Sequence, residues 1–198
     1  EERIKLVSQS NLGVSVTRNN GVNLARYNYV AFLDADDWWD EHFLEEMKGL
    51  IGLCPEAKLL GSNYYYIKAG KNRLEDKGLP DSFSAGYINY IATYGSKFVV
   101  PINCSFVVVK KDAFLAEGGF KSNLKLGEDF DLWIRLALKH KVAYINKPLA
   151  YSNQDVSINQ RALGIGKRWK TSEHFIFNLE YLAEDESRNP ELKHLLDG

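Results

Sequence analysis

The feature that most constrains this chain is an apolar run that ends abruptly in three aspartates. Residues 29–33 read Tyr-Val-Ala-Phe-Leu, and Asp34, Asp36 and Asp37 occupy three of the next four positions. At the mouth of a sheet, where the effective dielectric falls, repulsion between such close carboxylates reaches on the order of several kcal/mol. A hard divalent cation compensates for that repulsion by binding carboxylate oxygens, and strand ends are where open α/β sheets hold their ligands. The run therefore predicts a cation site at a sheet edge.

The same aspartates also have a structural interpretation, because an Asp after a strand is often a turn former or a helix N-cap. Apolar residues recur downstream at helical spacing, namely Phe43, Leu44, Met47, Leu50 and Ile51. We therefore predict a helix over residues 38–51 with Asp37 as its N-cap. Asp34 and Asp36 are left without a structural role, which makes them the functional candidates.

Two known motifs fit this segment poorly. An EF-hand loop needs an oxygen ligand and then a glycine where this chain has Trp38 and Trp39, so that motif is excluded. Phosphatases of the haloacid dehalogenase type also place D-x-D after an apolar strand, with the first Asp as nucleophile. They carry Thr or Val where Trp38 stands here, so a phosphatase remains only an alternative.

Sequence blocks on both sides of the aspartates narrow the choice. The blocks are Asn11-Leu12-Gly13, Arg18-Asn19-Asn20-Gly21 with Ala25, Gly118-Gly119-Phe120, and Gly127-Glu128-Asp129-Phe130-Asp131-Leu132-Trp133. In order and approximate spacing, over residues 4–152, they resemble the family 2 glycosyltransferases of GT-A fold. That family reads N-x-G, then R-N-x-G-x-x-x-A, then an apolar strand into D-A-D-D, then an acceptor-side block.

The resemblance implies both a fold and a set of site residues. The fold is an α/β, Rossmann-like GT-A domain for nucleotide-diphospho-sugars, with a mixed central sheet and helices on both faces. Asp36 is implied as the direct ligand of Mn2+ or Mg2+, and Asp34 as a ligand of the donor ribose or, through water, of the metal. Arg18 is implied at the nucleotide, Glu128 at acceptor hydroxyls, and Asp129 as the catalytic base.

Physical arguments leave alternatives open for two of these residues. Arg18 shares a helical face with Val22, where a buried guanidinium needs an anionic partner, either the nucleotide or the aspartate cluster. Asp129 stands at the start of a predicted helix, where the helix dipole keeps a carboxylate ionised at neutral pH. That position also suits a purely structural carboxylate. We interpret Asn19-Asn20-Gly21 as local backbone chemistry.

Composition indicates one folded domain with a small ligand rather than a nucleic-acid partner. The chain has 198 residues, of which 45% are hydrophobic, and its net charge is -1, so no basic field attracts nucleic acid. Cys54 and Cys104 lack metal-site spacing and are expected to be reduced and buried. No apolar run approaches the roughly 20 residues of a membrane span. We expect a cytoplasmic location, free or peripherally associated with the inner face of the membrane.

The periodicity predicts alternating strands and helices after an incomplete start. The expected strands are 4–7, 29–33, 57–67, 104–109, 142–145 and 149–151, and the expected helices are 14–26, 38–51, 85–94, 112–117 and 130–140. The first strand-helix unit of the family has no counterpart here. We therefore expect residues 1–198 to form a single glycosyltransferase domain, incomplete at its N-terminus, with a helical extension over 167–198.

The expected function follows from the resemblance. It is the metal-dependent transfer of a hexose-like sugar, with inversion, from a nucleoside diphosphate, UDP being the first choice, to a saccharide or lipid-linked acceptor in bacterial surface polysaccharide assembly. Polymerisation is disfavoured, because Arg168-Trp169 is present without the Gln of the processive Q-x-x-R-W motif. The rival is a sugar-nucleotide-binding or scaffolding domain without turnover.

Overall fold

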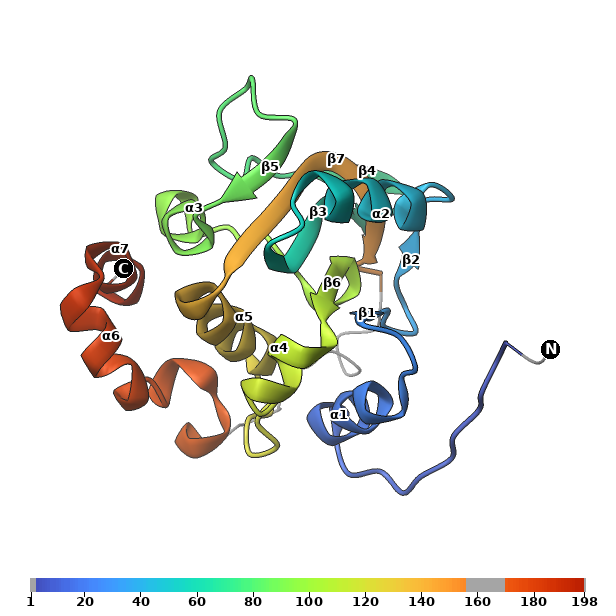
Figure 1. Cartoon of the computed structure of the whole chain (residues 1–198), viewed down its shortest axis with the longest axis horizontal. Helices are drawn as coiled ribbons and strands as arrows, with labels where there is room; N and C mark the ends of the chain where they lie inside the picture. Colours follow the sequence, from blue (N-terminus) through green and yellow to red (C-terminus); the bar gives the residue numbers. More distant parts are fainter. Residues whose placement is uncertain (1–2, 156–169, 198) are drawn as a thin grey trace.

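The computed structural model describes residues 3–155 and 170–197, in which strands and helices alternate (Figure 1). The strands are β1 (Tyr29–Ala31), β2 (Trp38–Trp39), β3 (Ala57–Lys68), β4 (Lys71–Leu74), β5 (Ala85–Ile88), β6 (Val107–Lys110) and β7 (Lys141–Asn153). The helices are α1 (Val14–Leu24), α2 (Phe43–Leu53), α3 (Tyr90–Lys97), α4 (Lys111–Ala116), α5 (Glu128–Lys139), α6 (Ala183–Arg188) and α7 (Pro190–Asp197). Short 3-10 turns are η1 (Cys104–Phe106), η2 (Thr171–Glu173), η3 (Phe175–Phe177) and η4 (Glu180–Leu182).

The strands form one mixed sheet, as the sequence predicts. Its order is β1-β6-β3-β7-β2, with β4 paired to β3 and β5 paired to β7. The two longest strands, β3 and β7, run parallel at its centre, and the other pairs are antiparallel. A parallel pair requires a crossover, and the chain between β3 and β7 supplies it with α3, α4 and α5. The crossover carries α5 back against β3, and α4 lies next to α5 (Figure 1).

Hydrophobic cores lie on both faces of the sheet, which confirms the predicted layering. On one face, α2 packs through Phe43, Met47 and Leu50 against Leu60 of β3 and Ala143 of β7. On the other face, a larger core is formed by Leu59, Val107, Val109, Leu132, Trp133, Leu136, Val142 and Tyr144. The amphipathic pattern of α5 therefore faces β3 and β7, and its first turn projects beyond the sheet.

The predicted strand over residues 4–7 is wrong. The N-terminal segment runs alone toward α1, and it pairs with no strand among the residues that the structure describes (Figure 1). Without a neighbour its backbone N–H and C=O groups are left to water, so the apolar pattern alone does not make a strand. Side chains hold the segment instead, because Gln9 donates to Thr17 Oγ1 at 2.6 Å and accepts from Asn20 at 2.8 Å.

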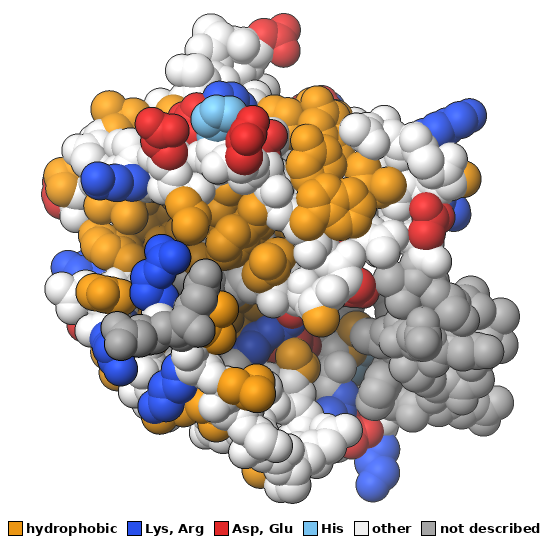
Figure 2. Space-filling view, turned by 90° about the vertical axis from the view of Figure 1, so that its right-hand side faces the viewer, with side chains coloured by type: hydrophobic (Ala, Val, Ile, Leu, Met, Phe, Trp, Pro, Cys, Tyr) orange, Lys and Arg blue, Asp and Glu red, His pale blue; other side chains and the backbone are white. Residues whose placement is uncertain are grey.

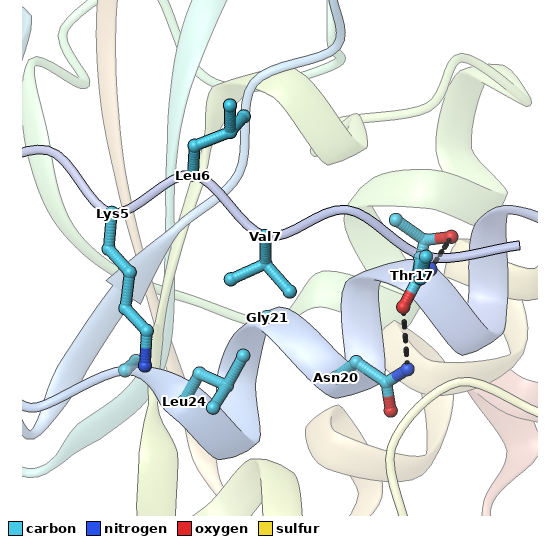
Figure 3. Close-up of a pocket in the computed structure, with 9 residues that line it drawn as sticks. Lys5, Leu6, Val7, Thr17, Asn20, Gly21 and Leu24 are labelled. Carbon is cyan, nitrogen blue, oxygen red and sulfur yellow. Dashed lines mark hydrogen bonds between the residues drawn. The ribbon is translucent and has the colours of Figure 1, made fainter.

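A hollow of about 460 Å³ separates this N-terminal segment from α1 (Figure 3). Val7 points toward the helix, whereas Leu6 points away from it and is 93% exposed. The described residues that line the hollow are mostly aliphatic or small polar, and Lys5 is the single ionisable group among them. The hollow therefore lacks the carboxylates that the sequence singles out. We locate the candidate site by the positions of those carboxylates and not by the volume of a cavity.

The predicted helix over residues 38–51 begins later than expected, and Asp37 is not its N-cap. Trp38 and Trp39 form β2, in which Trp38 lies opposite Tyr151 of β7. The N-cap of α2 is His42, whose backbone N–H donates to Asp40 Oδ1 at 3.0 Å. Aromatic side chains favour a half-buried strand over a helix here, because β7 offers them a pairing edge.

Other boundaries move for local reasons. Residues 85–88 form β5, and α3 starts only after Asn89, whose side chain accepts from Ala92 N at 3.1 Å. The strand predicted over 104–109 begins with the turn η1, because the Asn103 side chain accepts from Ser105 N. The two strands predicted over 142–151 are one strand, β7, whose Pro148 falls at an irregularity in the pairing with β3.

A buried ion cluster ties the C-terminal region to α5. Asp131 is fully buried and accepts from Lys121 at 2.7 Å, from Arg135 at 2.6 Å and 2.9 Å, and from Tyr181 Oη at 2.5 Å. Arg135 also donates to the carbonyl groups of the loop between α4 and α5. Beyond this cluster, α6 and α7 follow, and α7 packs on α3 (Figure 1). The expected helical extension over 167–198 starts at residues 167–169, including Arg168-Trp169, which lie outside the described residues.

Both cysteines are buried free thiols, in agreement with the sequence. Among the described residues, every helix is too short or too polar to cross a bilayer.

Candidate active site

Arg18 joins the two groups of carboxylates that are far apart in the sequence. Its Nη2 donates to Asp34 Oδ1 at 2.6 Å, and its Nη1 donates to Glu128 Oε1 at 2.8 Å. Its guanidinium also lies 5.5 Å from the centroid of the Phe120 ring. Burial lowers the pKa of Arg18, but Cys104, Asp34 and Glu128 raise it above its ordinary value, so the guanidinium remains charged. The predicted ion pair with the aspartate cluster is present, and it extends to the acceptor-side block.

Asn19, the next residue of α1, fixes the loop beside this ion pair. Its side chain accepts from Phe120 N at 3.0 Å and donates to Phe120 O at 2.8 Å. Gly119 has a φ of +68°, and a Cβ there would lie 2.6 Å from Asn19 Oδ1, so the glycine is required. The interpretation of Asn19 as local backbone chemistry is wrong, because its contacts are long-range.

The start of α5 places Glu128 and Asp129 in the same site. Gly127 precedes the helix with a φ of +77°, and a Cβ there would lie 2.7 Å from Phe175 Cβ. The C-terminal segment therefore packs directly on this turn, and it also bonds to it through Phe175 N and Leu126 O at 2.9 Å. Asp129 Oδ1 accepts from Phe130 N at 3.0 Å, which leaves the second carboxylate oxygen for other partners.

Asp129 holds its proton more tightly than an ordinary aspartate. Burial, followed by the charge of Glu128, raises the pKa of Asp129 to about 7, although Arg18 and the Phe130 N–H oppose the rise. The helix dipole therefore does not keep this carboxylate fully ionised at neutral pH, as the sequence analysis expected. Desolvation and a neighbouring like charge outweigh the dipole, which is worth only about 0.3–1 kcal/mol at such a position.

A pH profile follows if Asp129 acts as a base. The base must be ionised, and a group with a pKa of about 7 is roughly one-tenth ionised at pH 6 and nine-tenths ionised at pH 8. We expect kcat/KM for sugar transfer to rise about tenfold from pH 6 to pH 8. Initial rates at fixed donor concentration check this, and a rate that stays flat over this range contradicts it.

Ser105 is a site residue that the sequence analysis missed, because it lay inside a predicted strand. It is fully buried at the centre of η1, its Oγ accepts from Asp34 N at 3.1 Å, and it bonds to the Asp37 carboxylate. Its carbonyl accepts from Trp39 Nε1 at 2.7 Å. A signal was available, since polar residues in a buried apolar stretch need partners, and Asn103 and Ser105 interrupt such a stretch.

The three aspartates occupy different environments. Asp34 and Asp37 are held by the backbone of their own turn, since Asp37 N donates to Asp34 O at 3.2 Å. Asp37 Oδ1 also accepts from Asn153 N at 2.9 Å, and burial raises its pKa although Ser105 and Asn153 oppose the rise. Asp36 is exposed at the tip of the turn. The structural aspartate of the three is therefore Asp37, and Asp36 is free to bind a ligand.

The donor atoms of this turn suit a hard cation. Asp34 and Asp36 present carboxylate oxygens, and no three His, Cys, Asp or Glu side chains in residues 3–155 and 170–197 form a ready-made metal site. Mg2+ is commonly bound by one or two carboxylates together with phosphate oxygens and water. The two aspartates therefore fit a cation that binds together with a diphosphate.

Comparison with known proteins gives a consistent result. The family model described as "Glycosyltransferase like family 2" matches residues 3–186. The glycosyltransferase GlyA of Streptococcus pneumoniae serotype 4 is 28% identical over 75% of this chain and 22% of its own length. The amylovoran biosynthesis glycosyltransferase AmsB of Erwinia amylovora is 32% identical over 75% of this chain and 50% of its own length. The chain thus spans half or less of these two relatives.

Solved structures agree on the fold. The crystal structure of S. aureus TarS 1–349 in complex with UDP-GlcNAc superposes with a TM-score of 0.66 at 15% identity, covering 93% of this chain and 52% of that one. The complex of the same protein with UDP superposes with a TM-score of 0.58 over 74% of this chain. This likeness supports the predicted GT-A architecture. Because the family model covers nearly the whole chain, the protein belongs to the glycosyltransferase family 2-like group.

Proposed function

We propose that this chain is an inverting glycosyltransferase domain that moves a hexose-like sugar from a nucleoside diphosphate to a saccharide or lipid-linked acceptor. The observation that carries the proposal is the Arg18 bridge, which brings Asp34 of the donor-side motif and Glu128 of the acceptor-side motif into one site. A reaction between a donor and an acceptor needs both sets of groups within reach of the same atoms.

The proposed step is a single displacement. The acceptor hydroxyl oxygen attacks the anomeric carbon while Asp129 accepts the hydroxyl proton. The bond between the anomeric carbon and the diphosphate oxygen breaks, and its electron pair leaves with the nucleoside diphosphate. Attack from the face opposite the leaving group inverts the anomeric configuration. Glu128, the residue before Asp129 in the first turn of α5, orients the acceptor hydroxyls in this proposal.

The donor side has its own groups in this proposal. Asp34 binds the ribose hydroxyls or a metal-bound water, and Asp36 binds Mn2+ or Mg2+. When bound, that cation neutralises charge on the leaving diphosphate. Arg18 exchanges its carboxylate partners for the nucleotide. UDP is the first nucleotide to test, because the structurally similar TarS was crystallised in complex with UDP and with UDP-GlcNAc.

The acceptor and its setting are also proposals. AmsB is named for amylovoran biosynthesis, which supports an acceptor that belongs to a surface polysaccharide. A cytoplasmic reaction at the inner face of the membrane follows if that acceptor is lipid-linked.

Calorimetric titration of UDP in the presence of Mn2+ tests the donor site. We expect binding that depends on Mn2+ in the unsubstituted chain and a loss of affinity of at least tenfold in Asp36→Ala, because one of the two cation ligands is removed. The matched control is Glu41→Ala, which removes an 87% exposed carboxylate five residues away and should change nothing. Equal affinity in Asp36→Ala and the control would remove Asp36 from the donor site.

A further inference from the structure

Three aromatic rings from three strands form a stack beside the candidate site. Trp38 of β2 lies against Tyr151 of β7 with ring centroids 5.5 Å apart and planes 13° apart. Tyr151 in turn lies against Tyr65 of β3 at 5.7 Å and 23°. The strand register produces this arrangement, because Trp38 is opposite Tyr151 and Tyr151 is opposite Tyr65. We call these three residues the aromatic stack.

Trp38 is the open end of the aromatic stack. Trp39 faces the interior, where its ring stacks on Phe43 and its Nε1 donates to Ser105 O. Successive strand side chains point to opposite faces, so Trp38 faces outward, and it is 43% exposed. In the described part of the sheet β2 is the last strand in the order, so no strand there continues the stack beyond Trp38.

The exposed Trp38 ring is supported by stacked neighbours, which separates it from an isolated surface residue. Tyr151 supports one face of the indole, and Tyr65 supports Tyr151, so little side-chain freedom remains to be lost when a ligand binds. An exposed indole costs solvation free energy, and such surfaces commonly mark binding sites. Figure 2 faces this side of the molecule and shows hydrophobic side chains gathered in exposed patches there.

Trp38 lies close to the candidate donor ligands in the sequence and in the fold. Asp34 is the candidate ribose ligand, Asp36 is the candidate ligand of the diphosphate-bound cation, and Trp38 follows two residues later. Asp37, between Asp36 and Trp38, accepts from Asn153 N at 2.9 Å, and Asn153 follows Tyr151 by two residues in β7, so the aromatic stack lies beside the aspartate turn. The proposed reaction brings sugars to this turn, and the apolar C–H face of a pyranose ring is chemically suited to an indole face.

We propose that the aromatic stack is a saccharide-binding subsite in which Trp38 packs against a pyranose ring of the acceptor. The choice of ligand rests on the proposed function. The subsite makes that proposal more specific, because it implies that the acceptor is a saccharide chain rather than a bare lipid phosphate. Asp36, exposed on the same turn, offers a carboxylate for sugar hydroxyls near the ring. The subsite holds the acceptor and takes no part in proton transfer.

Intrinsic tryptophan fluorescence tests the subsite without any turnover. Chitotetraose, cellotetraose and maltotetraose are titrated separately into the unsubstituted chain. We expect a saturable change in emission with at least one of them. In Trp38→Ala, protein-detected NMR titration replaces fluorescence, and binding should weaken at least tenfold, as expected for a central aromatic anchor. Trp38→Phe should restore part of the affinity, and Tyr151→Ala should weaken binding by an intermediate factor, because it removes only the support.

Controls separate this inference from the proposed function. Tyr27→Ala removes an 80% exposed aromatic from another part of the surface and should leave saccharide affinity unchanged. Mn2+-dependent UDP affinity should be unchanged in Trp38→Ala. If UDP fails to bind the unsubstituted chain while saccharides bind through Trp38, the donor assignment falls and the subsite stands.

Three outcomes overturn the subsite. The first is that none of the three saccharides binds, and the second is that Trp38→Ala binds them as tightly as the unsubstituted chain. The third is that Trp38→Ala loses UDP affinity or dissociates a dimer seen by sedimentation, since Trp38 would then serve the nucleotide or a second copy of this chain.

Discussion

Asp129→Asn should lower kcat for sugar transfer by about 10²–10⁴ while leaving the affinity for UDP and Mn2+ unchanged. The substitution keeps the shape of the side chain and its acceptor bond from Phe130 N, but an amide cannot take a proton from the acceptor hydroxyl. Removal of a group that acts only in the transition state lowers kcat rather than binding. Release of UDP from UDP-GlcNAc in the presence of a saccharide acceptor measures the rate, and calorimetry measures the affinity.

Two comparisons make this result decisive. Asp112→Asn changes a 63% exposed aspartate at the start of α4 and should leave the rate and the affinity unchanged. The pH dependence of the residual activity in Asp129→Asn should also disappear near pH 7, because the group that titrates there is gone. A domain that only binds sugar nucleotides would show no turnover to lose. A rate in Asp129→Asn equal to the unsubstituted rate would exclude Asp129 as the base.

Asp131→Ala should destabilise the fold by about 3–5 kcal/mol, the typical cost of removing one partner from a buried ion pair. Lys121 and Arg135 would lose their shared carboxylate, and Arg135, only 12% exposed, would be left as a poorly compensated charge. Tyr181 would lose its acceptor at the same time, so the C-terminal segment would lose an attachment to α5. Urea unfolding followed by circular dichroism measures the change in the free energy of unfolding.

The matched control is Glu184→Ala. It removes one partner of the exposed ion pair with Arg188 in α6, and exposed pairs contribute only about 0–1 kcal/mol. Asp131 is fully buried and leaves two charged partners behind, whereas Glu184 is 73% exposed and leaves one. Similar small losses in both variants would mean that water reaches the Asp131 cluster and that burial does not set its energy.

The fold was predictable to the extent that long periodic segments determine it. The apolar spacing of α1 and α5 and the aromatic run of β3 each gave the correct element, because the two helices bury apolar side chains in the core and β3 is buried at the centre of the sheet. Short segments were less certain. Trp38 and Trp39 were predicted to begin a helix, and only the pairing edge of β7 makes them a strand. Pairing partners of this kind are distant in sequence, so local propensity does not reveal them.

The sequence motifs predicted the candidate site residues, but they did not predict the residues that hold those side chains in position. The motifs supplied Arg18, Asp34, Glu128 and Asp129, and the fold places them at one location. Asn19 and Ser105 hold that location together, yet each acts on backbone groups that are far away in sequence. The pKa of Asp129 also depends on burial that only the folded chain creates.

The Arg18 bridge also has a consequence for the order of folding. Arg18 and Glu128 are 110 residues apart in sequence, and Asn19 and Phe120 are 101 residues apart. Closing loops of that length is entropically unfavourable until the intervening sheet has formed, so contacts of high sequence separation form late and slow folding. During synthesis Arg18 therefore stays without its Glu128 partner, solvated by water or paired with Asp34, until α5 has been made. The candidate site is thus assembled only after α5 has joined the sheet.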